Sequence, residues 1–141
     1  MTLALWSLLA YAVWTLTLML GVFLARTQGV VTQTARITDF PADVPHGSNV
    51  YRRMTRAHLN CVENLPVFGA VVLVGDQGGL VHPAIDTLAI LVVAFRVAQS
   101  VAHISSGSGR VIMLRATFFA IQVLCILGMV GTEIGLWVTR R

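Results

Sequence analysis

The sequence predicts an all-α membrane protein, built as a bundle of four transmembrane helices. Of its 141 residues, 56% are hydrophobic and only 11% are charged, and the mean hydropathy is +0.78. A soluble domain of this size needs roughly a quarter of its residues charged to cover its surface. Most of the surface must therefore face lipid, which excludes a soluble globular enzyme and an intrinsically disordered chain. At ~20 residues for each crossing, the length accommodates about four helices.

Four apolar stretches, separated by polar or glycine-containing segments, indicate where the helices lie within a single domain over residues 1–141. The expected bounds are about 3–25, 53–75, 84–104 and 111–138, with a polar loop over about 26–52. The second helix is long enough to span a membrane only if it includes the polar residues between Arg53 and Glu63. Such side chains at membrane depth must face protein or a water-filled cavity, because lipid cannot solvate them.

The basic residues predict the orientation of the helices. All ten are arginines, and with six acidic residues they leave a formal net charge of +4. Seven of them lie in or beside the first and third connections between helices: Arg26, Arg36, Arg52, Arg53, Arg56, Arg110 and Arg115. Because cytoplasmic loops are enriched in basic residues, we expect both connections in the cytoplasm and both termini on the non-cytoplasmic side. No basic run is interleaved with aromatic residues, so no nucleic-acid partner is expected.

The second and third helices each carry a row of polar side chains. Residues three and four positions apart are neighbours on a helix surface, so each row occupies one face of its helix. The rows are Arg56, Asn60 and Glu63 on the second helix, and Arg96, Gln99 and His103 on the third. Both rows lie inside the segments that we expect to span the membrane.

Two charged members of these rows lie at similar depths. At ~1.5 Å of rise per residue, Glu63 lies about 15 Å inside the cytoplasmic start of its helix and Arg96 about 12 Å inside the cytoplasmic end of the next. Each charge is costly if it is left alone in lipid. We therefore predict a structural ion pair between Glu63 and Arg96, formed directly or through Asn60.

A surplus of positive charge remains beyond this pair. The arginines expected near the cytoplasmic ends of the four helices are Arg26, Arg53, Arg56, Arg96 and Arg110. One nearby carboxylate does not balance them, and a cavity with that excess of cations favours an anionic ligand. The alternative is that Glu63 and Arg96 only lock two helices together. No metal is expected, because Cys61 and Cys125 lie far apart without the spacing of a zinc site.

The stretch RAHLNCVENLPVF, residues 56–68, resembles a signature of the MAPEG family, the membrane-associated proteins in eicosanoid and glutathione metabolism. The shared features are an Arg-Ala pair, then Asn and Glu at three-residue spacing, then Pro. The resemblance extends over nearly the whole chain, with four crossings, a long first cytoplasmic loop and arginines at positions 96 and 110.

This resemblance implies a homotrimer, with glutathione bound as cosubstrate between neighbouring protomers. A lipophilic substrate would enter from the membrane lipid above it. By its spacing from Arg96, Arg110 corresponds to the catalytic arginine that holds glutathione as a thiolate. The glutathione-binding positions that the resemblance and the neighbouring charges suggest are Arg26, Arg53, Arg56, Asn60, Glu63, Gln99 and His103. Gln99 and His103 stand where well-studied members carry tyrosines.

The resemblance therefore implies a glutathione transferase or peroxidase that conjugates or reduces lipophilic electrophiles, lipid hydroperoxides included, as in detoxification. It would be an integral multi-pass protein of a bacterial inner membrane, with its active site facing the cytoplasm. One alternative is a catalytically silent protein of the same fold that binds lipid or glutathione. A small four-helix transporter ranks last, because such proteins usually need an acidic residue facing the substrate path and residues 3–25 contain none.

Overall fold

The computed structural model describes residues 1–40 and 47–140 and places almost all of them in helices. The long helices are α1 (Leu3–Val31), α2 (Asn49–Gln77), α3 (Pro83–Ser105) and α4 (Gly109–Thr139). A short 3₁₀ helix, η1, covers Ile37–Asp39. Each of the four long helices is long and apolar enough to cross a membrane. The predicted all-helical membrane architecture is confirmed.

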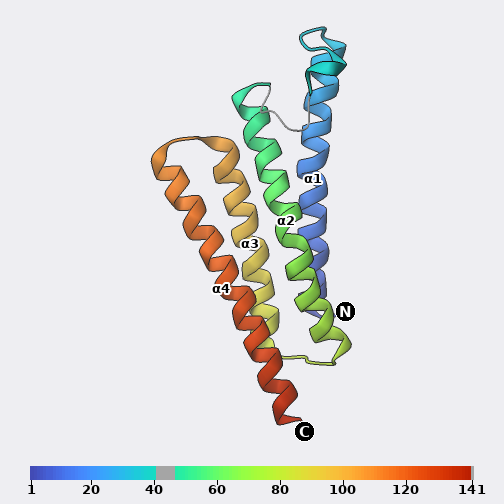
Figure 1. Cartoon of the computed structure of the whole chain (residues 1–141). Coiled ribbons are helices and arrows are strands. Elements are labelled where there is room, and N and C mark those ends of the chain that lie inside the picture. Colours follow the sequence, from blue (N-terminus) through green and yellow to red (C-terminus); the bar gives the residue numbers. More distant parts are fainter. Residues whose placement is uncertain (41–46, 141) are drawn as a thin grey trace.

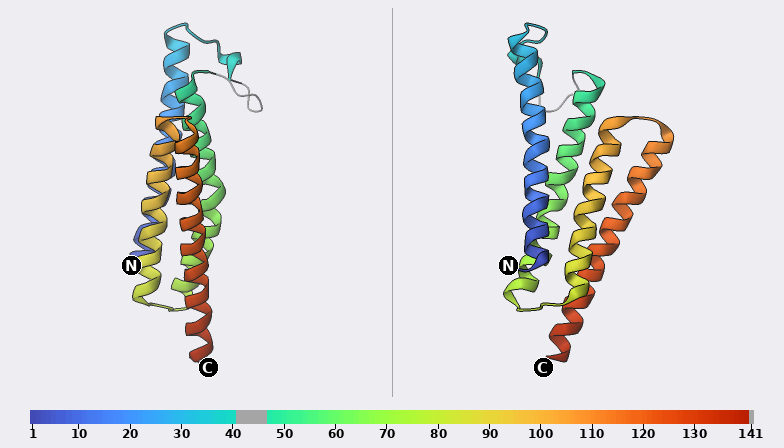
Figure 2. Two further views of the ribbon diagram at one scale, coloured as in Figure 1. Left: turned by 90° about the vertical axis from the view of Figure 1, so that its left-hand side faces the viewer. Right: turned by 180° about the vertical axis from the view of Figure 1, so that it is seen from behind.

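The helices run alternately up and down, so that both chain termini lie at one end of the bundle (Figure 1). The α1–α2 and α3–α4 connections lie at the other end, which we call the arginine-rich end. Its arginines are Arg26, Arg36, Arg52, Arg53, Arg56, Arg110 and Arg115. α4 leans away from α1 and α2 toward this end (Figure 2). Accordingly, α3 and α4 pack extensively on each other, whereas α2 and α4 touch little.

The first predicted loop is shorter than expected, because helices occupy both of its ends. α1 continues past Arg26 to Val31, and the amides of Thr34 and Ala35 then donate to the carbonyl of Gly29. α2 begins at Asn49, where the hydroxyl of Ser48 accepts from the amide of Tyr51. Charged residues end the apolar stretch but do not end a helix, which continues until its backbone groups find caps. Residues 41–46 of the predicted loop lie outside the described residues.

The interior combines an apolar core with lipid-facing outer surfaces. Tyr11 of α1 packs on Phe68 of α2, with ring centroids 5.5 Å apart, and Met129 of α4 is fully buried. Large hydrophobic side chains are exposed on all four helices. An exposed apolar surface of that extent is what a membrane-spanning bundle requires, because lipid and not water surrounds it.

A buried polar cluster, which we call the Arg96 network, joins α3 to α4. Nη1 of Arg96 donates to Oε1 of Gln99 over 2.8 Å, and Nε2 of Gln122 donates to the same oxygen over 3.1 Å. Nε2 of Gln99 donates to the backbone carbonyl of Arg115 over 3.2 Å. The side chain of Gln99 is thus held on both of its polar ends, and its amide oxygen accepts a hydrogen bond from a guanidinium that is 2% exposed.

We predict that Gln99→Leu lowers the free energy of unfolding by about 2–3 kcal/mol, because it removes the acceptor of a buried charged donor. Gln28→Leu, on the exposed surface of α1, is the matched control and should change stability by less than ~0.5 kcal/mol. Thermal unfolding of the detergent-solubilised protein measures both variants. Equal stability of the two variants would show that the Arg96 network does not stabilise the bundle.

Candidate functional site

The polar row of α2 lies on the outer face of the bundle. Arg56 and Glu63 are exposed and Asn60 is half-buried, whereas Ala57 and Cys61 point into the core. The three polar residues do share one face, as their spacing predicts. That face points away from the other helices of the chain, so at membrane depth its polar groups need partners from outside this chain.

The polar row of α3 points the opposite way, into the bundle. Arg96, Gln99 and His103 are all buried. Arg96 also lies beside Tyr11, with its guanidinium carbon 5.7 Å from the centroid of the tyrosine ring. Its Nε has no hydrogen-bond partner in the part of the chain described. The two rows that the sequence places at similar depth are therefore not brought together within one chain.

The predicted ion pair between Glu63 and Arg96 is not formed within the described chain and stays a prediction. Arg96 bonds to Gln99, while Glu63 is exposed on the outer face of α2. Across residues 1–40 and 47–140 no hydrogen bond or ion pair joins Arg96 to Glu63 or to Asn60. Helical spacing shows which residues share a face, but it leaves open which faces of two helices meet.

His103, in the last turn of α3, is a buried side chain at the arginine-rich end. It is 6% exposed, and neither ring nitrogen has a hydrogen-bond partner among the described residues. The charges of Arg115, Arg56 and Arg53 all act on its imidazole, with no acidic side chain among them. A buried polar group in such a field favours an anionic neighbour.

The other arginines at this end differ in how they are held. Nε of Arg53 donates to the carbonyl of Ile104 over 2.9 Å, which ties α2 to the C-terminal end of α3. Nε of Arg26 donates to the hydroxyl of Tyr51. Arg110, the second residue of α4, is exposed. Guanidinium groups from α1, α2 and α4 thus gather at one end, and those of Arg56 and Arg110 point outward.

The sequence alone did not single out several polar contacts of this interior. Tyr51 was assigned to a loop, and Gln122 lies in a stretch that is otherwise apolar. Ser100 accepts from Nε1 of Trp14 over 3.2 Å, which joins α3 to α1. Buried glutamines and tyrosines of this kind have no fixed spacing from their partners. A polar residue in an apolar run is the one signal that could have marked Gln122.

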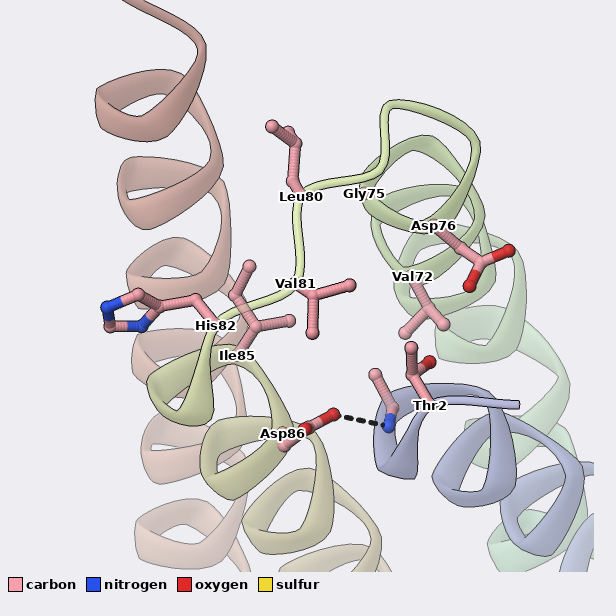
Figure 3. Close-up of a pocket in the computed structure, with 10 residues that line it drawn as sticks. Thr2, Val72, Gly75, Asp76, Leu80, Val81, His82, Ile85 and Asp86 are labelled. Carbon is pink, nitrogen blue, oxygen red and sulfur yellow. Dashed lines mark hydrogen bonds between the residues drawn. The ribbon is translucent and has the colours of Figure 1, made fainter. Parts of the chain in front are cut away.

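The opposite end of the bundle offers no room for a substrate at the cavity drawn in Figure 3. The cavity has a volume of about 10 Å³ and lies between the start of α1, the end of α2 and the start of α3. That is space for a single water molecule. Asp86 lines it, and its Oδ1 accepts from the amide of Ala4 over 2.8 Å, so this carboxylate caps α1 (Figure 3).

Glu133 of α4 is a buried carboxyl near the same end. It is 7% exposed and packs against Gly75 of α2, where any Cβ would lie 2.5 Å from its Oε1.

The described residues hold no group of three or more histidine, cysteine or acidic side chains that could bind a metal ion. The arginines gathered at the arginine-rich end favour the binding of an anion there.

Comparisons with known proteins place the chain in a family. No curated protein and no solved structure matches it. The family model described as "MAPEG family" matches residues 3–134. This match covers nearly the whole sequence, from the start of α1 into the last turns of α4, and the chain belongs to the MAPEG family.

Proposed function

We propose that this chain is a glutathione-dependent membrane enzyme that conjugates or reduces lipophilic electrophiles, lipid hydroperoxides among them. Family membership supports a glutathione-related integral membrane protein at that general level. The observation that carries the specific proposal is the gathering of Arg53, Arg56 and Arg115 around the buried imidazole of His103, with no acidic side chain of the described residues acting on it. Glutathione carries two carboxylates and, once its thiol is deprotonated, a thiolate, which are the anionic groups that these arginines would bind. It also carries one ammonium group.

The outward-facing row of α2 supports an assembly in which neighbouring copies share the site. Arg56, Asn60 and Glu63 lie where a single chain would leave them against lipid, and a second copy packed on this face would remove that cost. A homotrimer with glutathione between protomers is the arrangement that we propose. Glu63 would then accept hydrogen bonds from the ammonium group of glutathione, and Arg56 would bind one of its carboxylates.

The topology and the charges support an active site on the cytoplasmic side. Both connections that carry the arginines lie at one end of the bundle (Figure 1). Basic residues favour the cytoplasmic face of a membrane, so the arginine-rich end would face the cytoplasm, and both termini would lie on the other side of a bacterial inner membrane. Glutathione would enter from water, and the lipophilic substrate would enter from the bilayer along the exposed apolar sides of the helices.

Arg110 is the residue that we propose as catalytic. A free thiol has a pKa near 8.5, so only a few per cent of it is thiolate at neutral pH. A guanidinium beside the sulfur, shielded from water by a neighbouring protomer, would lower that pKa by roughly one or two, at ~1.4 kcal/mol for each. In conjugation the thiol proton passes to water, the thiolate sulfur bonds to the electrophilic carbon, and the leaving group departs with the bonding electrons.

The remaining predicted binding residues would have more limited roles. Arg53 already donates through Nε to Ile104, so its other donors would reach a carboxylate. His103 can donate a hydrogen bond from either ring nitrogen. Gln99 would act indirectly, because its amide is bonded to Arg96, to Gln122 and to the backbone of Arg115.

One observation favours the second candidate, a catalytically silent protein of the same fold that binds glutathione or lipid. The side chain of Gln99 is bonded within the protein at both of its polar ends. It stands where well-studied members carry a tyrosine that contacts glutathione. Anion binding does not need that contact, so turnover is the measurement that separates the two candidates.

We predict that Arg110→Ala lowers the rate of glutathione conjugation to a chlorinated dinitrobenzene by about 10- to 100-fold at pH 7, because the thiol returns to its ordinary pKa. The rate of the variant should then recover as the pH rises toward 8.5, where the thiol deprotonates without help. Arg140→Ala is the matched control, because Arg140 lies at the other end of α4, where it donates to the carbonyls of Gly78 and Gly79. An unchanged rate in Arg110→Ala would remove this residue from the mechanism.

We predict that Glu63→Gln weakens glutathione binding by about 10-fold or more, since it removes the charged acceptor of the ammonium group. Glu133→Gln is the control, because Glu133 is buried at the opposite end of the bundle. Calorimetric titration of the purified protein measures both. Wild-type binding without turnover of any electrophile would favour the silent candidate, whereas no binding at millimolar glutathione would contradict both.

A further inference from the structure

Tyr51 is firmly held at the arginine-rich end, although it was not among the predicted site residues. It lies in the first turn of α2 and is 7% exposed. Its amide donates to the capping hydroxyl of Ser48 over 3.2 Å. Its ring lies so close to the backbone of Gly47 that a Cβ there would approach the ring within 2.8 Å, and Gly47 has a φ of +75°. Glycine at this position lets the chain pass the ring without strain.

Three segments of the chain combine to hold the guanidinium of Arg26. Its Nε donates to the hydroxyl of Tyr51, and its guanidinium carbon lies 5.8 Å from the centroid of that ring. The ring of Phe40 lies 5.6 Å from the same carbon. The two rings meet edge to face, at 61° and with centroids 6.1 Å apart. Arg26 comes from α1, Tyr51 from α2, and Phe40 from the segment between them.

This arrangement leaves one particular edge of the guanidinium for a ligand. A guanidinium binds a carboxylate with two parallel hydrogen bonds, either from Nε and one Nη or from both Nη atoms. Nε of Arg26 is already used by Tyr51. No hydrogen bond or ion pair of Arg26 to a carboxylate is present among residues 1–40 and 47–140. The edge formed by Nη1 and Nη2 is therefore the one that can accept a carboxylate from outside the chain.

We infer that Tyr51 is a positioning residue for glutathione: it fixes Arg26 so that the Nη edge receives one of the two carboxylates of the tripeptide. The inference rests on the proposed function, because it takes glutathione as the ligand. A mobile arginine loses rotamer freedom when it binds an anion, whereas an arginine held by a hydroxyl and two rings has lost it beforehand. The hydroxyl of Tyr51 thereby strengthens binding without touching glutathione.

The first experiment replaces the hydroxyl and keeps the ring. Tyr51→Phe should raise the Kd for glutathione about 5-fold, because the lost hydrogen bond fixes Arg26 beforehand and does not itself contact glutathione, and should leave kcat at saturating glutathione unchanged. Tyr11→Phe is the matched control, because Tyr11 is a buried tyrosine whose hydroxyl has no partner among the described residues. Its Kd should equal that of the wild type. An unchanged Kd in Tyr51→Phe would overturn the inference.

A double-mutant cycle separates positioning of Arg26 from a general structural role. Arg26→Ala should raise the Kd about 30-fold or more, as expected for the loss of a bidentate contact to a carboxylate. Adding Tyr51→Phe to Arg26→Ala should then change nothing further, because the residue that it positions is gone. A further 5-fold loss in the double variant would show that Tyr51 acts through something other than Arg26, and would overturn the inference.

Two further arms keep the outcome decisive. If Tyr51→Phe does not fold, Phe40→Leu removes one ring from Arg26, and a rise of about 2- to 3-fold in Kd is expected from a lost cation–π contact. An unchanged Kd there counts against the inference. If the wild-type protein binds no glutathione, the proposed function fails and the inference with it. If the wild type binds and Tyr51→Phe binds equally well, only the role of Tyr51 fails.

Discussion

The requirement that dominates this structure is that a polar group inside a membrane-spanning bundle must find its partner within protein. Arg96 is the clearest case. Its guanidinium lies between α1, α3 and α4, with the amide of Gln99 as acceptor and the ring of Tyr11 beside it. The neighbouring Gln122 bonds to the same amide oxygen. The hairpin of α3 and α4 is thus held by a polar core as well as by apolar packing.

The polar rows of α3 and α2 differ in what surrounds them, and this difference indicates where a partner from outside the chain would bind. The polar row of α3 is buried against its own chain, whereas Arg56 and Glu63 project from the outer face of α2. Neither residue can be accommodated by lipid at low cost. An outer face that carries charges at membrane depth favours a partner that binds there. The proposed second copy, together with an anionic ligand, would meet that need.

The sequence predicted what depends on local patterns and missed what depends on how helices meet. Four apolar stretches of sufficient length predicted four helices, and the spacing of residues 56, 60 and 63 predicted a shared face; both are present. The family was recognised from the motif at residues 56–68, and the family match confirms it. Glu63 and Arg96 do not pair among the described residues, because depth along a helix says nothing of rotation about its axis. The candidate site itself, with Arg110 as the catalytic residue, stays a prediction.

The contacts that hold Arg26 could not be predicted from the sequence either, for a different reason. The end of the apolar stretch at Arg26 looked like the end of a helix, so Phe40 and Tyr51 were assigned to one polar loop. In the structure α1 and α2 both extend into that stretch, and the rings of Phe40 and Tyr51 flank the guanidinium between them. Aromatic residues within a polar segment are the sequence signal that indicates such packing, because large rings are more stable when they are packed than in a solvated loop.

The arginines of this chain therefore fall into two classes that composition cannot distinguish. Arg96, Arg53 and Arg140 each donate to an acceptor of the chain itself, Arg96 to a side chain of its own helix and the other two to backbone carbonyls of another segment. Arg56 and Arg110 are exposed, and Arg26 is held by a hydroxyl that leaves one edge of its guanidinium for a ligand. The positive charge that remains for an anion is consequently smaller than the count of arginines suggests. It is also better placed, because it gathers on the outer side of one end, where two protomers would meet.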